Sequence, residues 1–342
     1  MGITIKDIAT IAGVSTSTVS LVMSGKGYVS NKTRQKVQNV IDEYNYRPLL
    51  AARQLANNRT GNLGFIISDV HLARSEAFYS RVLHGAELEA RNYDTSLILS
   101  SVAMDLVIPG NIPRFLQGRD VDGVIVAGSV PDELIRYLKN ENIPLVLIDY
   151  RIPDLKIDTV FMDNRLGLSL VINHLVSQKI KKIAFIGGSN RHPSIKERFE
   201  GYQIAMEHAG LGHISRDEKY RYFIESETNM EVGIEGISEV LKNIPDIEAV
   251  VCVNDTTAAG CIQQLRKLKK RIPKDIAVVG FDNNNYASMT HPPLTSVQVP
   301  KIELGVEAIR LLISRIENPQ QIHQTRIIPV DLIIRESSLK SI

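Results

Sequence analysis

The first residues with chemistry to offer are a run of short hydroxyl side chains near the N-terminus. Ser15, Thr16, Ser17, Thr18 and Ser20 lie within one stretch of residues 15–20. A hydroxyl can donate or accept a hydrogen bond, and a short side chain lets the backbone approach closely. A helix with such residues can therefore enter the major groove of DNA and meet base edges. The run predicts contacts to DNA bases, provided that a helix presents it.

Capping residues and a glycine predict that helix. Ser15 can cap a helix that continues through Leu21 toward residues 24–25. A shorter helix is expected before it, because Thr4 can cap its start, with Asp7 three positions on, and Gly13 can end it. Two helices joined by so short a turn form a helix-turn-helix.

A third helix is expected to begin after Ser30 and to carry basic side chains toward phosphates. Lys32, Thr33 and Arg34 stand in its first turn. Its inner face is predicted to hold Val37, Val40, Ile41 and Tyr44. The first sixty residues contain eight basic and three acidic residues, although the whole chain has a net charge of only +2. A solvated basic surface, or a three-helix bundle that binds protein, would be the alternative, and the hydroxyl run favours DNA.

This N-terminal segment closely resembles the LacI/GalR family of bacterial regulators. The similar stretches are residues 4–9, 12–20, 29–30 and 33–34. The resemblance implies that Thr16, Ser17 and Leu21 occupy base-reading positions. Many relatives have Arg where this chain has Leu21, and an apolar side chain there would favour a thymine methyl group over guanine. The predicted DNA-binding residues of residues 1–46 are Thr4, Ser15, Thr16, Ser17, Thr18, Ser20, Leu21, Ser30, Lys32, Thr33 and Arg34.

Residues 47–60 form the predicted linker to the rest of the chain. The segment is rich in helix formers but too short for a stable isolated helix. By the family resemblance it is a hinge that folds on DNA, where Leu55 wedges between base pairs of the minor groove beside the small residues Ala52 and Ala56. A flexible tether is the alternative interpretation.

The remaining residues, 61–342, predict an α/β domain. Apolar, β-branched runs alternate with helical stretches, which is typical of parallel sheets covered on both faces. The expected strands are residues 63–67, 96–99, 121–126, 145–148, 182–186, 249–253 and 276–279. Two sets of such units indicate two similar, doubly wound subdomains.

Polar residues stand at the carboxyl ends of several predicted strands, where open parallel sheets bind ligands. They are Asp69, Asp149, Asn254, Asp255 and Asp282. Carboxylates and amides can hydrogen-bond to the hydroxyl groups of a ligand. For Asp255 the cap of the following helix is an equal alternative.

The body also resembles the periplasmic-binding-protein-like sensor domain of the same family, through residues 163–164, 198–202, 254–260, 280–283 and 332–338. The resemblance implies a cleft that holds an effector against Asp149, Arg198, Asn254 and Asp282. Phe78 and Tyr79 match an aromatic pair that packs on the ligand, with core packing as the alternative. The expected subdomains are roughly 61–161 plus 292–322, and 162–291 plus 323–342.

Two departures from the family concern the effector. The loop after Asp69 is longer than in most relatives, and residues 104–110 are unusually apolar. Both are expected to border the cleft, which suggests a ligand larger or less polar than a simple sugar.

Other classes of protein fit the sequence less well. The chain lacks nucleotide-binding glycine motifs, its eight histidines show no metal-ligand spacing, and Cys252 and Cys261 are read as small buried residues, so no enzyme, metal or cofactor is expected. A transport receptor would need a signal core, which residues 1–12 lack, and no apolar run could span a membrane. We therefore expect a cytoplasmic, ligand-responsive transcription regulator. Most specifically, it would be a homodimeric repressor of carbohydrate genes that binds a pseudo-palindromic operator and is switched by a sugar or glycoside.

Overall fold

The computed structural model describes residues 3–24, 27–46, 59–73, 78–108, 110–189, 192–224 and 228–339. The chain divides into two compact units, Met1–Gly61 and Asn62–Ile342. The predicted hinge residues Ala52, Leu55 and Ala56 lie outside the described residues. Among the described helices, none combines the length and the apolar character that crossing a membrane requires.

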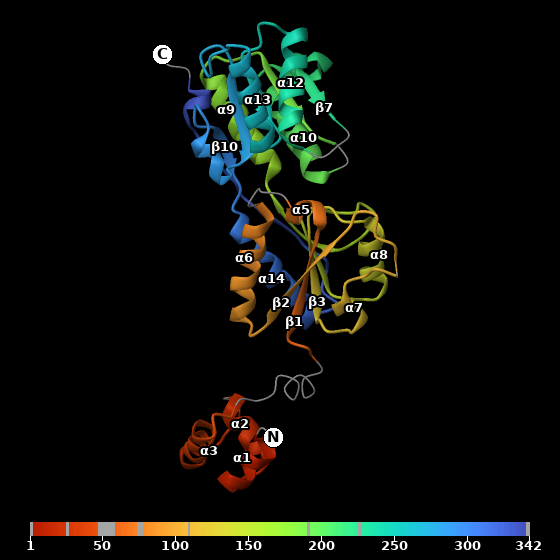
Figure 1. Ribbon diagram of the computed structural model, residues 1–342, viewed down its shortest axis with the longest axis vertical. Helices are drawn as coiled ribbons and strands as arrows, with labels where there is room; N and C mark the ends of the chain where they lie inside the picture. Colours follow the sequence, from red (N-terminus) through yellow and green to blue (C-terminus); the bar gives the residue numbers. More distant parts are fainter. Residues whose placement is uncertain are drawn as a thin grey trace. The chain divides into compact units, whose positions relative to one another are not determined.

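The N-terminal unit contains three helices, α1 (Ile5–Ala12), α2 (Thr16–Ser24) and α3 (Asn31–Glu43) (Figure 1). Thr4 and Asp7 form a reciprocal capping box at the start of α1. Gly13 ends this helix with φ of 62°, a left-handed conformation that glycine adopts without strain. The predicted helix starts and the tight turn between α1 and α2 are confirmed.

A small apolar core holds these helices together. Its centre is made by residues such as Ile8, Val19 and Val37, each with no exposed surface. Tyr44 was expected on the inner face of α3, and that prediction is wrong, because its side chain is 46% exposed. It follows the last residue of α3, where the chain turns, and Tyr46 is buried instead.

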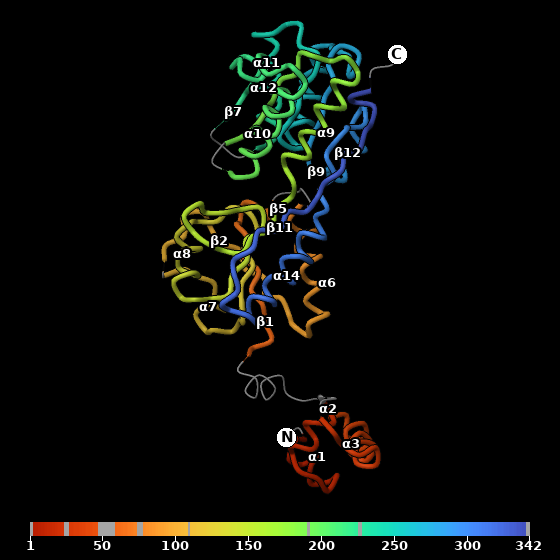
Figure 2. The backbone as a smooth tube through the Cα atoms, turned by 180° about the vertical axis from the view of Figure 1, so that it is seen from behind, coloured from red at the N-terminus to blue at the C-terminus, as the bar shows by residue number. Residues whose placement is uncertain are grey.

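The second unit contains two six-stranded sheets (Figures 1 and 2). In the first sheet the order is β11 (Thr325–Ile328), β5 (Asp158–Met162), β4 (Leu145–Ile148), β3 (Gly123–Ala127), β1 (Asn62–Ser68), β2 (Ser96–Val102). In the second the order is β12 (Asp331–Ile333), β10 (Thr295–Gln298), β9 (Ala277–Asp282), β8 (Ala249–Cys252), β6 (Ile183–Gly187), β7 (Arg221–Phe223). Among the described residues, every pair of neighbouring strands is parallel except β10 with β12.

Helices cover both faces of each sheet. Those of the first subdomain are α5 (Asp69–Ala73), α6 (Phe78–Asn92), α7 (Arg114–Gln117), α8 (Asp132–Asn140) and α14 (Lys301–Glu317). Those of the second are α9 (Asn164–Ser177), α10 (Pro193–His208), α11 (Gly212–Arg216), α12 (Met230–Asn243) and α13 (Asp255–Lys267). In β1, Phe65 joins the core under α6 and α14, whereas its neighbour Ile66 joins the core under α7 and α8. This alternation explains why the strands read as continuous apolar runs.

The chain crosses between the two subdomains three times: between β5 and α9, between β10 and α14, and between β11 and β12. The predicted subdomain boundaries are wrong at the last two crossings. They assigned residues 295–298 to the first subdomain and residues 325–328 to the second, but strand pairing places them the other way round. Both segments are four-residue strands, so their sheet is decided by the partner strand rather than by local sequence.

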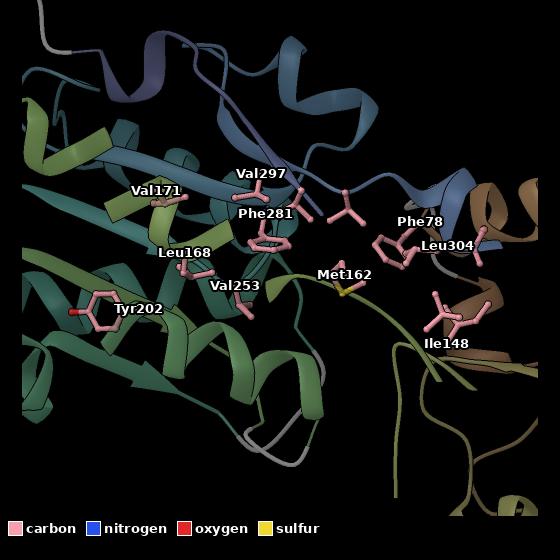
Figure 3. Packing of buried hydrophobic residues seen from close by; sticks show 14 of the residues in the cluster. Phe78, Ile148, Met162, Leu168, Val171, Tyr202, Val253, Phe281, Val297 and Leu304 are labelled. Carbon is pink, nitrogen blue, oxygen red and sulfur yellow. The ribbon is translucent and has the colours of Figure 1, made fainter. Parts of the chain in front are cut away.

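The buried apolar residues near the crossings come from both subdomains (Figure 3). Phe281 and Val297 of the second sheet pack near the crossing on one side, and Phe78, Ile148 and Leu304 pack on the other. Met162, the last residue of β5, belongs to the same cluster. The apolar core is thus continuous from one subdomain to the other along the segments where the chain crosses between them.

Candidate functional site

The exposed face of α2 carries most of the predicted base-reading side chains. Thr16, Ser17 and Ser20 are exposed, whereas Val19 on the opposite face is fully buried. Leu21 is 38% exposed. The helix therefore presents a surface of small polar groups with one apolar side chain among them.

The other hydroxyls of the predicted set cap helices. The Ser15 oxygen accepts a hydrogen bond from the Thr18 backbone at 3.1 Å and pairs with the Thr18 hydroxyl at 2.9 Å. Ser30 does the same for Thr33, at 3.2 and 2.8 Å. Ser15 and Ser30 therefore cap the starts of α2 and α3, and Thr16, Ser17 and Ser20 remain as exposed hydroxyls on α2.

The basic side chains of the predicted set stand at the start of α3. Lys32 is exposed and Arg34 is half-buried. Tyr28, which sequence reasoning did not select, is 96% exposed in the loop before α3. An aromatic residue beside Gly27 in a basic segment is the sequence signal that could have found it.

In the second unit, Asp149 lies at the carboxyl end of β4 with φ of 59°. Its side chain is buried and accepts a hydrogen bond from the Tyr79 hydroxyl at 3.0 Å. It also accepts one from the hydroxyl of Ser194, at the start of α10. Asp149 therefore connects the first sheet to a helix of the second subdomain.

Arg198 lies one turn further along α10 and is 5% exposed. It donates to the Asn164 side chain at 2.9 Å, to the Val253 backbone oxygen at 2.6 Å and to Asp282 at 3.3 Å. Its guanidinium lies 3.7 Å from the centre of the Phe281 ring. Arg198 thus ties together the carboxyl ends of β8 and β9, and a ligand would meet a guanidinium already held in place.

The helix cap that the sequence suggested as an alternative for Asp255 is provided by Asn254 instead. The Asn254 side chain caps α13 by accepting from the Thr257 backbone at 2.9 Å, and its amide donates to Thr228 at 2.8 Å. Asp255 is fully buried and accepts hydrogen bonds from Ser296 at 2.5 Å and the Asn284 backbone at 2.6 Å. Burial, with Asp282 nearby, raises the pKa of the Asp255 carboxyl to about 8. The cap is therefore Asn254, and Asp255 is a buried acid.

The aromatic pair is also divided. Phe78 is 8% exposed and belongs to the apolar core, whereas Tyr79 is half-buried and turns its hydroxyl to Asp149. His71 of α5 packs against Tyr79, with ring centres 4.8 Å apart, and pairs with Ser129 at 3.1 Å. Asp69 is exposed at the start of α5. The core-packing alternative thus holds for Phe78.

The α10 helix brings these groups together, and sequence reasoning missed its residues Ser194 and Glu197. Ser194 and Arg198 are four positions apart, so one helix face meets both Asp149 and Asp282. Between them, Glu197 pairs with Arg151 of the β4–β5 loop at 2.8 Å. Pro193, a favoured first residue of a helix, was the available signal for this helix start.

Comparisons with known proteins find relatives for both units of the chain. The bacterial regulatory proteins of the lacI family match residues 4–48, and the periplasmic binding protein-like domain matches residues 172–338. The HTH-type transcriptional regulator RegA of Clostridium saccharobutylicum is 34% identical over 341 residues, which cover 99% of this chain and 100% of that protein. A ribose operon repressor of Haemophilus influenzae is 30% identical, with 98% of each chain covered.

A solved structure agrees with the fold of both units. The complex of the transcriptional regulator CelR with cellobiose has a TM-score of 0.74 at 27% identity, covering 98% of this chain and 99% of that one. The two curated relatives are transcription regulators, not enzymes. The helix-turn-helix unit and the two-sheet sensor unit, together with identity along nearly the whole length, mean that this chain belongs to the lacI family of bacterial transcription regulators.

Proposed function

We propose that this protein represses genes of carbohydrate uptake or catabolism and is switched by a sugar-like effector. The observation that carries the proposal is the convergence of Asp149, Arg198 and Asp282 on the first turns of α10. Carboxylates and a guanidinium held at the carboxyl ends of strands suit a ligand with several hydroxyl groups. The cellobiose complex of CelR and the ribose operon repressor are relatives whose names point to sugars.

We propose an effector that is larger or less polar than a monosaccharide. Met104 and Val107, in the segment that follows β2, are 50% and 67% exposed. They stand after the carboxyl end of a strand, as Asp69 and Asp149 do. A glycoside could place its sugar on the polar groups and its aglycone on this apolar segment.

The proposed DNA target is a pseudo-palindromic operator bound by a homodimer in the cytoplasm. Thr16, Ser17, Ser20 and Leu21 would read bases, and Lys32 with Arg34 would contact phosphates. We add Tyr28 to this set because of its exposure. The hinge residues Ala52, Leu55 and Ala56 would enter the minor groove.

The effector would control DNA binding by changing the relative populations of two subdomain arrangements. Asp149 and Ser194 belong to different subdomains, so a ligand that binds either group differently in the two arrangements shifts their balance. The change in DNA affinity cannot exceed the ratio of the ligand's affinities for the two subdomain arrangements.

Two measurements test the proposal. Thermal-shift screening of the purified protein against sugars, glycosides and nucleobases should find a stabilising sugar or glycoside. Fluorescence anisotropy with duplex DNA should then show an affinity that falls with salt and changes when that ligand is added. A ligand that demonstrably binds at Arg198 yet leaves operator affinity unchanged would refute the coupling.

A further inference from the structure

A pocket lies beside the crossings between the subdomains. It has a volume of about 680 Å³ and is formed by the first turns of α6 and α14 and by the loop after β9. Its lining includes none of the seven predicted effector residues. We call it the crossing pocket and define it by Arg81, Asn284, Ser288, Lys301, Glu303 and Arg335.

The crossing pocket carries an excess of positive charge. The lining contains three basic side chains, Arg81, Lys301 and Arg335, and one carboxylate, Glu303. The Glu303 carboxylate lies 3.9 Å from Arg310, a residue outside the pocket lining. The side chains that line the pocket thus carry more positive than negative charge.

The hydrogen bonds of the three cations go to neutral oxygens. Arg81 donates to the Asn285 side chain at 2.8 Å. Lys301 donates to the backbone oxygen of Asp282. Arg335 donates to the Leu294 backbone oxygen at 2.6 Å and to the Asn283 side chain at 2.8 Å. Each cation is therefore positioned by the protein, and within the part of the chain that the structure describes none of the three donates a hydrogen bond to a carboxylate.

The burial of Lys301 strengthens this point. Its side chain is only 5% exposed, and burial lowers the pKa of its ammonium group, although Asp282 and Asp255 act in the opposite direction. An anion in the pocket would stabilise the charged form of Lys301.

A buried amide adds a second reason for a polar ligand. The side-chain nitrogen and oxygen of Asn284 are enclosed, and neither has a hydrogen-bond partner within the described residues. Buried polar groups are normally paired, and exceptions call for an explanation. A ligand or water that reached this amide as donor and acceptor would supply it.

The geometry points to a site for a small metabolite with phosphate or carboxylate groups, separate from the effector cleft. The pocket is large enough for such a molecule. Its walls belong to both subdomains, because Arg81 stands on α6 and its partner Asn285 on the loop after β9. A bound anion would therefore favour one subdomain arrangement and act as a second regulatory ligand.

The test uses the full-length protein with inorganic pyrophosphate and citrate as probes, at constant ionic strength and with chloride as the control for nonspecific anion effects. The two probes distinguish phosphate from carboxylate recognition. At least one should raise the melting temperature saturably, and its apparent affinity should fall at least tenfold in Arg81→Met. Ser288→Phe should have the same effect by filling the pocket without removing charge. Arg91→Met, an exposed change on the same helix α6, is the matched control and should bind like the unaltered protein.

Several results would overturn the inference. One is the absence of a saturable shift with either probe. Another is wild-type binding by both Arg81→Met and Ser288→Phe, which would place the anion elsewhere. If a second copy of the chain covers the pocket, Ser288→Phe should dissociate an oligomer in sedimentation experiments while no anion binds. None of these readouts uses operator DNA or a sugar, so they can fail independently of the proposed function.

Discussion

The hydroxyl of Ser194 donates a hydrogen bond to the carboxylate of Asp149, and this contact joins the two subdomains of the second unit. Asp149 follows the last residue of β4 in the first sheet, and Ser194 is the second residue of α10 on the other subdomain. The ion pair between Arg151 and Glu197, at 2.8 Å, crosses at the same place. The proposed effector site is therefore also the place where the present subdomain arrangement is held together.

Ser194→Ala should destabilise the second unit measurably. It removes one hydrogen bond from a buried carboxylate, which costs about 1.5–3 kcal/mol for a charged acceptor. Tyr79 would remain as a donor to Asp149. Urea denaturation should show the loss, with Ser177→Ala as control, because the Ser177 hydroxyl donates to the His174 backbone oxygen at an exposed position. Equal stabilities of the two variants would mean that the Asp149 contact contributes little.

Replacing Arg198 should affect both ligand response and stability. Arg198→Lys cannot keep all three hydrogen bonds or the flat contact with Phe281, because a lysine ammonium is not a planar fork, and we expect a loss of about 1.5–3 kcal/mol. We expect no thermal shift with the effector, while the folded protein still binds operator DNA in anisotropy experiments at low temperature. A normal effector shift would remove Arg198 from the proposed site.

Asp255 predicts a pH dependence of stability. Its folded-state pKa of about 8 lies above the ordinary value of 3.8, so the unfolded chain loses this proton first. The contribution is full below about pH 4 and is lost as pH rises through about 8, with a slope of up to about 1.4 kcal/mol per pH unit. Asp255→Asn, which mimics the protonated acid, should flatten this slope in urea titrations between pH 5 and 9.

Asp275 supplies the matching control for that titration. Arg271 lowers the pKa of the Asp275 carboxyl from its ordinary value of 3.8 to about 2. The contribution of this ion pair to stability is therefore present above pH 3.8 and is lost only as pH falls through about 2. Asp275→Asn should leave the slope between pH 5 and 9 unchanged. If Asp255→Asn does the same, the Asp255 carboxyl is ionised in the folded protein at neutral pH.

Leu21 should set base preference, whereas Lys32 should set general affinity. Leu21→Arg is expected to move selected DNA sequences from thymine toward guanine at one position of each half-site. Lys32→Gln should weaken all duplexes alike and reduce the salt dependence by about one phosphate contact. Selection from a random DNA library, followed by salt titration, measures both. An unchanged preference in Leu21→Arg would show that this side chain does not face bases.

Leu55→Ala should weaken operator binding much more than binding to unrelated DNA. The proposed wedge acts only where the hinge folds on a specific site, and the kink it makes costs a few kcal/mol that added contacts offset. Competition experiments with operator and random duplexes measure the ratio. Equal losses on both would refute the wedge.

The sequence by itself determined the local elements. Thr4, Ser15 and Ser30 were predicted to cap helices and do so, because a cap depends on residues within three positions. All seven expected strands are present, since continuous β-branched runs between helical stretches leave few alternatives. The acidic residues Asp149 and Asp282 stand at strand ends for the same reason.

Only the tertiary structure decided which distant segments meet. The four-residue strands β10 and β11 exchange sheets relative to the prediction, because only pairing with β9 and β5 assigns them. Asn254 and Asp255 are adjacent in sequence, yet one caps a helix and the other is a buried acid held by Ser296. Likewise, Arg81 and Asn285 lie far apart in the chain, and only folding places them on one pocket. Local propensity acts over a few residues, whereas these contacts depend on how the sheets and α10 pack.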